Sequence, residues 1–358
     1  MLLLNPGPVN VTARVRQSLT QADLCHRESE FFDLQDEARE RLLAVYALDP
    51  SQWRAVLITA SGTGAVESML ASLVPGSGRV LVVENGVYGE RMAQICARYG
   101  IAHARNTVSW LSPVDLDAVR SCLAAAHANE PFTHLAIVHH ETTTGRLNAL
   151  HALGELCRAY RVSLLVDGVS SFGAEALDFA DGTVCAVAAT ANKCLHGVPG
   201  VSFVVARRSA LEQAAPRSYY LDLGRLSRLQ DRRDTPFTPA VHATYALVEA
   251  LREFAEQGGR IARHRRYAAL AEQVRSGLAE LGVESVLAPA QSSVVLRAYH
   301  LPPDMGYVAL HDGLKSEGFV IYAGQGDLSR TLFRISTMGD LTSEDMARFV
   351  RCFGQLVR

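Results

Sequence analysis

The N-terminal part of the chain alternates between short apolar segments and longer segments with the apolar spacing of helices. The apolar segments cover residues 56–60, 79–84, 134–139, 164–167, 184–191 and 201–205. Parallel strands need crossover connections of about a dozen residues or more, usually helices. The alternation therefore predicts an α/β fold with a mostly parallel sheet and helices on both faces.

The C-terminal part changes this pattern. Helices are predicted at 241–256 and, after Gly258 and Gly259, to about Leu281. The segments beyond them give strand, helix, strand, strand and helix, at 294–298, 307–317, 319–322, 332–336 and 343–356. Such a mixture is typical of an α+β unit. We expect a large domain of residues 1–240, including the N-terminal segment, and a small domain of residues 241–358.

Composition narrows the class of protein. The 358 residues are 48% hydrophobic with a net charge of -2, which fits a soluble enzyme and gives no reason to expect a nucleic-acid or membrane partner. The arginines of 260–266 are interpreted as a solvated helix face, because acidic residues balance the chain. Seven scattered cysteines favour a reducing cytoplasm over a disulfide framework. The N-terminus has no basic region and only a short apolar run, so no signal peptide is expected.

Lys193 is placed unusually for a solvated cation. It follows the apolar segment 184–191 and precedes the turn 197–200, so it lies where a strand ends and a tight loop begins. Burial and nearby cations lower the pKa of a lysine, and its free amine can then attack an aldehyde. Most lysines are simply exposed, however. Position alone leaves both interpretations open.

Asp167 favours the reactive lysine. It ends the apolar strand 164–167, and α/β folds bind ligands at the carboxyl ends of their strands. Pyridoxal phosphate needs an anion of this kind beside its pyridinium nitrogen, because the protonated ring is the electron sink. Taken alone, the aspartate could instead cap a helix or hold a metal.

A glycine-rich turn, Ser61-Gly62-Thr63-Gly64, joins the strand 56–60 to a predicted helix. Free N–H groups and the helix dipole at such a turn suit a phosphate, although the same residues also form an ordinary N-cap. Tyr88 follows the next strand, where it could stack on a flat ring or cover the edge of the core.

Four other polar residues have two interpretations each. His139 and Glu141 resemble metal ligands but have no third ligand at useful spacing, which favours a structural pair and no metal. Arg27 could bind an anionic substrate or pair with a neighbouring glutamate. Arg334 lies in an apolar strand and needs an anion, either a substrate carboxylate or phosphonate or an internal acid.

These features together resemble the class V aminotransferases, a group of fold-type I pyridoxal-phosphate enzymes. The likeness spans nearly the whole chain. Its most specific motifs are Asn85-Gly86-Val87-Tyr88-Gly89, Glu141-Thr142-Thr143-Thr144-Gly145, Ser170-Ser171-Phe172-Gly173, Ala191-Asn192-Lys193-Cys194 and Gly197-Val198-Pro199-Gly200.

The resemblance implies a role for each matching residue. Lys193 would carry the cofactor as an imine, and Asp167 would pair with the pyridinium nitrogen. The cofactor phosphate would be held by Ser61, Gly62, Thr63 and Asn192, and by Thr238 from a second subunit, which implies a homodimer with shared active sites. Tyr88 would stack on the ring and Thr142 would reach its 3-hydroxyl. Arg334, with Arg27 as a second cation, would bind the acidic end of the substrate.

The implied reaction is a transamination between an amine and a 2-oxo acid. Within the group the likeness is greatest to the members that exchange an amino group between 2-aminoethylphosphonate and pyruvate. Serine or alanine with glyoxylate or pyruvate is the alternative. A desulfurase is disfavoured because no cysteine lies between Cys194 and Cys352.

The chain departs from the usual family motifs at four places. Asn5 replaces threonine, Gly168 replaces alanine, Gln325 replaces lysine, and Ile335-Ser336-Thr337-Met338-Gly339 replaces Ile-Gly-Asn-Ile-Gly. Three of the four are expected where substrate is held.

Overall fold

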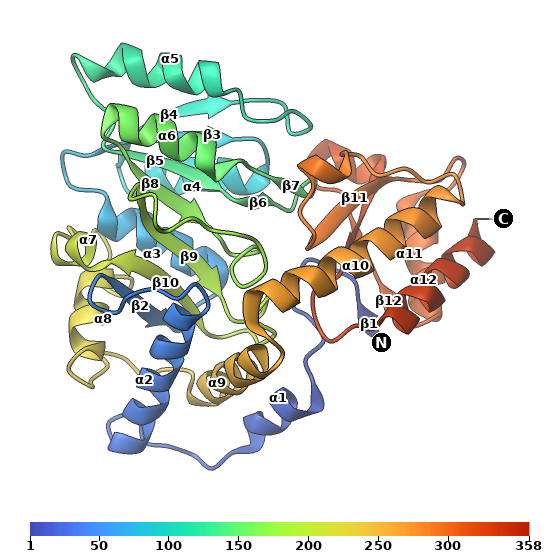
Figure 1. Cartoon of the computed structure of the whole chain (residues 1–358), viewed down its shortest axis with the longest axis horizontal. Coiled ribbons are helices and arrows are strands. Elements are labelled where there is room, and N and C mark those ends of the chain that lie inside the picture. Colours follow the sequence, from blue (N-terminus) through green and yellow to red (C-terminus); the bar gives the residue numbers. More distant parts are fainter. Residues whose placement is uncertain (358) are drawn as a thin grey trace.

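The computed structural model describes residues 1–357, and its larger unit is built on a seven-stranded sheet (Figure 1). In spatial order the sheet contains β2 (Trp53–Ile58), β10 (Ser202–Arg207), β9 (Val184–Thr190), β8 (Ser163–Asp167), β5 (His134–Val138), β3 (Arg79–Glu84) and β4 (Ala102–Thr107). Only β10 runs antiparallel to its neighbours, whereas the pairs β9–β8, β8–β5, β5–β3 and β3–β4 are parallel. The predicted mostly parallel sheet is confirmed.

Helices cover both faces of this sheet, because successive strand residues point to opposite sides. Leu81 belongs to the core cluster under α2 (Ser29–Ala44), α5 (Leu116–His127), α6 (Leu150–Tyr160) and α9 (Val241–Glu256). Val82 belongs to the cluster under α3 (Gly62–Leu73), α4 (Val87–Arg98) and α8 (Leu223–Gln230). Burying both faces explains why the central strands read as continuous apolar runs.

Two features of this unit were not predicted. The strand β4 lies at the sheet edge and carries polar residues, with only Asn106 buried, so it has no apolar run to detect. The motif around Glu141 forms a hairpin of β6 (His140–Glu141) and β7 (Arg146–Leu147), in which Glu141 pairs with Arg146.

The smaller unit contains an antiparallel sheet in the order β11 (Leu296–His300), β14 (Leu332–Ser336) and β13 (Tyr322–Ala323). The helices α10 (Gly259–Ala279), α11 (Tyr307–Ser316) and α12 (Ser343–Leu356) pack against it around a separate core. The first strand, β1 (Leu2–Leu3), pairs with β12 (Phe319–Val320), and Leu4 belongs to this core. The N-terminal segment therefore contacts the small unit, while α9 packs on α2 of the large unit. The domain division at residue 240 stays a prediction.

Short helices complete the described part of the chain. They are α1 (Ala13–Gln17), α7 (Arg208–Glu212) and the 3₁₀ turns η1 (Ser18–Thr20), η2 (Pro289–Gln291) and η3 (Gly326–Arg330). Among residues 1–357, no helix combines the length and the apolar character that crossing a membrane would require.

Candidate active site

The strand ends bring the predicted residues to one edge of the large sheet. β8 ends at Asp167, and β9, its parallel neighbour, ends at Thr190, three residues before Lys193. A cavity of about 290 Å³ opens there. It is lined by Ala60, Ser61, Gly62, Thr63, Val66, Tyr88, Arg91, Asp167, Val169, Thr190, Asn192, Lys193, Pro199 and Gly200.

Lys193 lies mostly buried in this cavity. Its Nζ donates a hydrogen bond to the backbone carbonyl of Pro6, in the N-terminal segment. The turn is fixed by backbone bonds, since the N–H of His196 donates to the carbonyl of Lys193 at 2.9 Å. The pKa of Lys193 is lowered to about 8, chiefly by burial and also by the charge of Arg334, while Cys194 and Asp167 oppose the decrease. A larger fraction of this amine is therefore neutral at physiological pH than of an ordinary lysine.

Asp167 is 7% exposed and points into the same cavity. Its Oδ1 accepts a hydrogen bond from the backbone N–H of Val169 at 2.9 Å, which orients the carboxylate. Burial raises its pKa to about 6, an increase that the Val169 bond and the charges of Arg91 and Lys193 oppose. Within residues 1–357 no cation lies within ion-pair distance of Asp167. The carboxylate is thus available to a positively charged group that enters the cavity.

The predicted anion-binding turn lies at the N-terminus of α3. Ser61 is the N-cap residue, but its side chain forms no capping hydrogen bond. The first N–H groups of a helix have no partners inside it, so these groups and the helix dipole face the cavity. Asn192 contributes one more donor: its Oδ1 accepts the hydroxyl proton of Thr190 at 2.8 Å, which leaves its Nδ2 hydrogens free.

Arg334 is 3% exposed on β14, and carbonyl oxygens hold it in place of a carboxylate. Its Nε donates to the carbonyl of Ala323 and its Nη1 to the carbonyl of Thr142, both at 2.8 Å. Burial lowers its pKa. It forms no ion pair with any described residue, so the internal acid considered from the sequence is not found. The structure brings Arg334 to Thr142, and through Thr142 to the β6–β7 hairpin.

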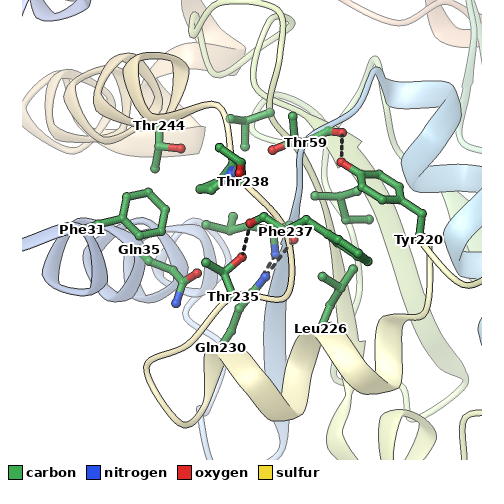
Figure 2. A pocket seen from close by; sticks show the side chains of 14 residues that line it. Phe31, Gln35, Thr59, Tyr220, Leu226, Gln230, Thr235, Phe237, Thr238 and Thr244 are labelled. Carbon is green, nitrogen blue, oxygen red and sulfur yellow. Dashed lines mark hydrogen bonds between the residues drawn. The ribbon is translucent and has the colours of Figure 1, made fainter. Parts of the chain in front are cut away.

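Four predicted site residues, Arg27, Thr142, Thr238 and Arg334, are not among the residues that line this cavity. Thr142 and Arg334 contact each other, as described above, whereas Arg27 and Thr238 lie elsewhere. Arg27 is 60% exposed at its side chain and lies 3.7 Å from Asp234, not beside Glu28 or Glu30. Thr238 lines a different, smaller cavity of about 40 Å³, together with Thr59 and Tyr220 (Figure 2). The assignment of these two residues to an active site therefore stays a prediction.

His139 and Glu141 are not a pair. The His139 Nδ1 lies 3.0 Å from the Ser171 hydroxyl. The Glu141 carboxylate accepts the hydroxyl of Thr143 at 2.7 Å and backbone N–H groups of Thr143, Tyr88 and Gly89. Burial raises the pKa of Glu141 to about 7. The expected structural role holds, but each residue has its own partners.

A family model described as aminotransferase class V matches residues 12–300, which is more than half of the chain. The chain belongs to the class V aminotransferase family. It is a pyridoxal-phosphate-dependent aminotransferase, as the motifs predicted.

Individual relatives agree with the family assignment. The 2-aminoethylphosphonate–pyruvate transaminase of Syntrophobacter fumaroxidans is 36% identical over 98% of this chain and 94% of its own length. The protein of the same name from Bacillus cytotoxicus is 34% identical over 99% of this chain and 97% of its own. Among solved structures, an alanine–glyoxylate aminotransferase from Nostoc sp. superposes with a TM-score of 0.92 at 26% identity, covering 100% of this chain and 95% of the other. The fold-type I architecture is therefore confirmed.

The cavity of this aminotransferase fits pyridoxal phosphate. An aldehyde needs an amine, which Lys193 offers. A pyridinium nitrogen needs an anion, and Asp167 has no cation of its own in residues 1–357. A phosphate needs N–H and hydroxyl donors, which the α3 N-terminus provides. All three requirements are met around one cavity.

Sequence analysis missed two groups in this site. Arg91 lines the cavity, where its Nη1 donates to the Thr63 hydroxyl oxygen at 3.0 Å. The carbonyl of Pro6 contacts Lys193 from a segment 187 positions away in sequence. Arg91 could have been suspected from its position three residues after Tyr88 on a helix, because such residues share a face. A backbone carbonyl leaves no trace in sequence.

The departures from the family motifs have structural partners. A Cβ at Gly168 would lie 2.6 Å from a methyl group of Val187, so the usual alanine does not fit beside this valine. The Asn5 Nδ2 donates to the Pro8 carbonyl at 3.1 Å, and the Ser336 hydroxyl donates to the Val295 carbonyl at 3.1 Å. The Gln325 amide lies 3.1 Å from the Thr143 hydroxyl. Each departure is therefore accommodated within the chain.

Proposed function

We propose that this aminotransferase moves the amino group of 2-aminoethylphosphonate to pyruvate, giving phosphonoacetaldehyde and alanine, or runs the reverse reaction. The observation that carries the proposal is Arg334, a buried guanidinium beside the cavity with carbonyl partners and no carboxylate among residues 1–357. Such a cation needs an anion, which the acidic end of the substrate supplies. Support also comes from relatives of that name at 34–36% identity.

The roles of the cofactor-binding residues follow from their positions. When bound, pyridoxal phosphate supplies an aldehyde for amines and a ring that accepts negative charge. Lys193 would hold this aldehyde through Nζ, and the same atom, when free, would move the substrate proton. Asp167 would hold the proton on the ring nitrogen by its negative charge. Ser61, Gly62, Thr63 and Asn192 would bind the phosphate.

The remaining residues would orient the cofactor ring and the substrate. Tyr88 lines the cavity and would cover one face of the ring. Thr142 would reach the 3-hydroxyl, and its carbonyl accepts a hydrogen bond from Arg334 at 2.8 Å, so neighbouring atoms would position cofactor and substrate. Arg334 then binds the phosphonate with the part of its guanidinium that the two carbonyls leave free.

The working unit in this proposal is a homodimer. Thr238 and Arg27 lie outside the cavity of their own chain, and Tyr219, which packs against Phe237 beside Thr238, is 76% exposed. If a second copy covered this surface, Thr238 would contact the cofactor phosphate bound by that copy. Sedimentation of the full-length protein should give twice the chain mass at micromolar concentration. A monomer that retains full activity would contradict the shared site.

A cytoplasmic location is proposed on the same basis as in the sequence. All seven cysteines are free in the described structure, and six of them are not exposed. Free thiols persist in reducing compartments. Recovery of the protein from the periplasmic or secreted fraction of its host would argue against this location.

The proposed reaction is tested by single-turnover loss of the yellow absorbance of the cofactor. We expect 2-aminoethylphosphonate to discharge the colour at least about tenfold faster than serine at equal concentration, because Arg334 pairs with a dianion. Replacing Arg334 by glutamine should lower kcat/KM for the phosphonate by about 10²-fold, since a buried charge partner is lost. Steady-state rates with pyruvate should follow ping-pong kinetics.

Arg330→Gln is the matched control. Arg330 is exposed, lies four residues before Arg334, and should tolerate the change without loss of activity. If serine or alanine with glyoxylate reacts fast and the phosphonate does not react, the alternative activity is correct. The similarity to an alanine–glyoxylate aminotransferase structure supports alanine and glyoxylate as the substrates to test for this alternative.

A further inference from the structure

Two cationic residues, Lys193 and Arg91, line the cavity. The family motifs assigned a role to Lys193 but none to Arg91. It lies in the second turn of α4, three residues after Tyr88. Its Nη1 is 3.0 Å from the Thr63 hydroxyl oxygen, and its guanidinium carbon lies 4.7 Å from the centre of the Tyr88 ring. No carboxylate in residues 1–357 forms an ion pair with it. A cation in a cavity without an acidic partner indicates a place for an anion.

The hydrogen bond between Arg91 and Thr63 has a definite direction. Arginine is only a donor, so the Thr63 oxygen must accept. A hydroxyl has one proton and two lone pairs, and accepting one bond leaves its proton to be donated elsewhere. No described residue accepts that proton. Thr63 lies in the first turn of α3, where the N–H groups of Gly62 and Thr63 have no partner among the described residues, so its hydroxyl proton is free for the same anion.

The contact with Tyr88 couples the ring to this turn. The guanidinium of Arg91 covers one face of the Tyr88 ring, which leaves the opposite face for a flat ligand. The same side chain therefore contacts the two residues expected to hold the phosphate end and the ring end of the cofactor. Burial raises the pKa of the Asp167 carboxyl, and the positive charge of Arg91 opposes that increase.

We propose that Arg91 is a cofactor-positioning residue: it directs the Thr63 hydroxyl proton toward the cofactor phosphate, adds positive charge beside that phosphate, and fixes the Tyr88 ring against the cofactor. The inference needs pyridoxal phosphate but does not depend on which amine the enzyme uses.

Cofactor binding by the full-length protein tests this role without measuring turnover. The protein, freed of cofactor, is titrated with pyridoxal phosphate and, separately, with pyridoxal, which lacks the phosphate; imine absorbance reports binding. We expect Arg91→Gln to weaken pyridoxal phosphate about 10- to 100-fold, the range for a lost charge-assisted bond. The affinity for pyridoxal should fall by less than about threefold, because pyridoxal has no phosphate for Arg91 and Thr63 to contact.

A double-mutant cycle separates action through Thr63 from general packing. Thr63→Val removes the hydroxyl with little change in shape. If Arg91 acts through Thr63, the double variant should bind pyridoxal phosphate nearly as well as Arg91→Gln alone. Arg98→Gln is the matched control, since Arg98 is exposed at the end of the same helix. Arg91→Lys, which keeps the charge, should recover part of the affinity and serves as the test if Arg91→Gln does not fold.

Two results would overturn the proposal. Equal losses for pyridoxal phosphate and pyridoxal would mean that Arg91 only supports the shape of the cavity. Unchanged affinity for pyridoxal phosphate in both Arg91 variants would mean that it does not position the cofactor at all. Fully additive losses in the cycle would remove the part of the role assigned to Thr63.

Discussion

Replacing Lys193 by alanine is expected to reduce kcat/KM for transamination by at least about 10³-fold. The variant loses both the amine that binds the cofactor aldehyde and the group that moves the proton, and proton transfer alone contributes about 10²- to 10⁴-fold. Lys193 is suited to both tasks because burial lowers its pKa to about 8. Steady-state assays with 2-aminoethylphosphonate and pyruvate measure the loss.

The sequence provides an unusually clean control for this experiment. The chain contains two lysines, Lys193 and Lys315. Lys315 is exposed near the end of α11, so Lys315→Ala should keep full activity. Borohydride should fix the cofactor to the wild-type protein and to Lys315→Ala, and the modified peptide should contain Lys193. Fixation at Lys315, or activity in Lys193→Ala, would refute the assigned role.

The same pKa gives the pH dependence of cofactor attachment. The neutral amine is the nucleophile, so the rate at which added cofactor forms the imine should rise with pH up to about 8 and level off above it. For an ordinary lysine the rise would continue to about pH 10. Stopped-flow absorbance on cofactor-free protein distinguishes the two profiles.

Replacing Asp167 by asparagine is expected to lower kcat by about 10²- to 10³-fold, the usual effect of removing one electrostatic contact to a reacting group. The carboxylate charge keeps a proton on the cofactor ring, and a neutral amide cannot. Asparagine retains an oxygen for the Val169 N–H, which Asp167 accepts at 2.9 Å, so the loop should keep its shape. Single-turnover kinetics measure the loss.

Cofactor should still bind to Asp167→Asn, because the phosphate turn and Lys193 are unchanged. Asp117→Asn is the control, since the Asp117 side chain is 92% exposed on α5 and should not affect the rate. A variant Asp167→Asn with wild-type kcat would show that the ring proton does not depend on this carboxylate.

The sequence predicted most of what lies along single strands and their ends. The apolar segments of the large sheet are long and continuous because that sheet is buried on both faces, and β3 begins and ends where expected. The bounds of β14, α9 and α12 also agree with those predicted. Asp167, Lys193 and the Ser61 turn follow such strands directly, and parallel strands bring their carboxyl ends to one edge. Local pattern and one topological rule therefore located the centre of the site.

Strand β4 shows where local pattern fails. It lies at the edge of the sheet and pairs only with β3. Its residues 102–107 are therefore mostly not buried, and no apolar run marks the strand. The pairing of β1 with β12 fails for a different reason: its partners are more than 300 positions apart, and two-residue strands carry no periodicity.

The sequence by itself determined the fold class and the family, and it predicted which residues would contact the cofactor. Only the tertiary structure decided what surrounds them: the Pro6 carbonyl at Lys193, the Thr142 and Ala323 carbonyls at Arg334, and Arg91 between Thr63 and Tyr88. These contacts join backbone atoms or helices distant in sequence. Some of these contacts lie within one unit and others between the two, and the packing of both units is set by the whole core at once.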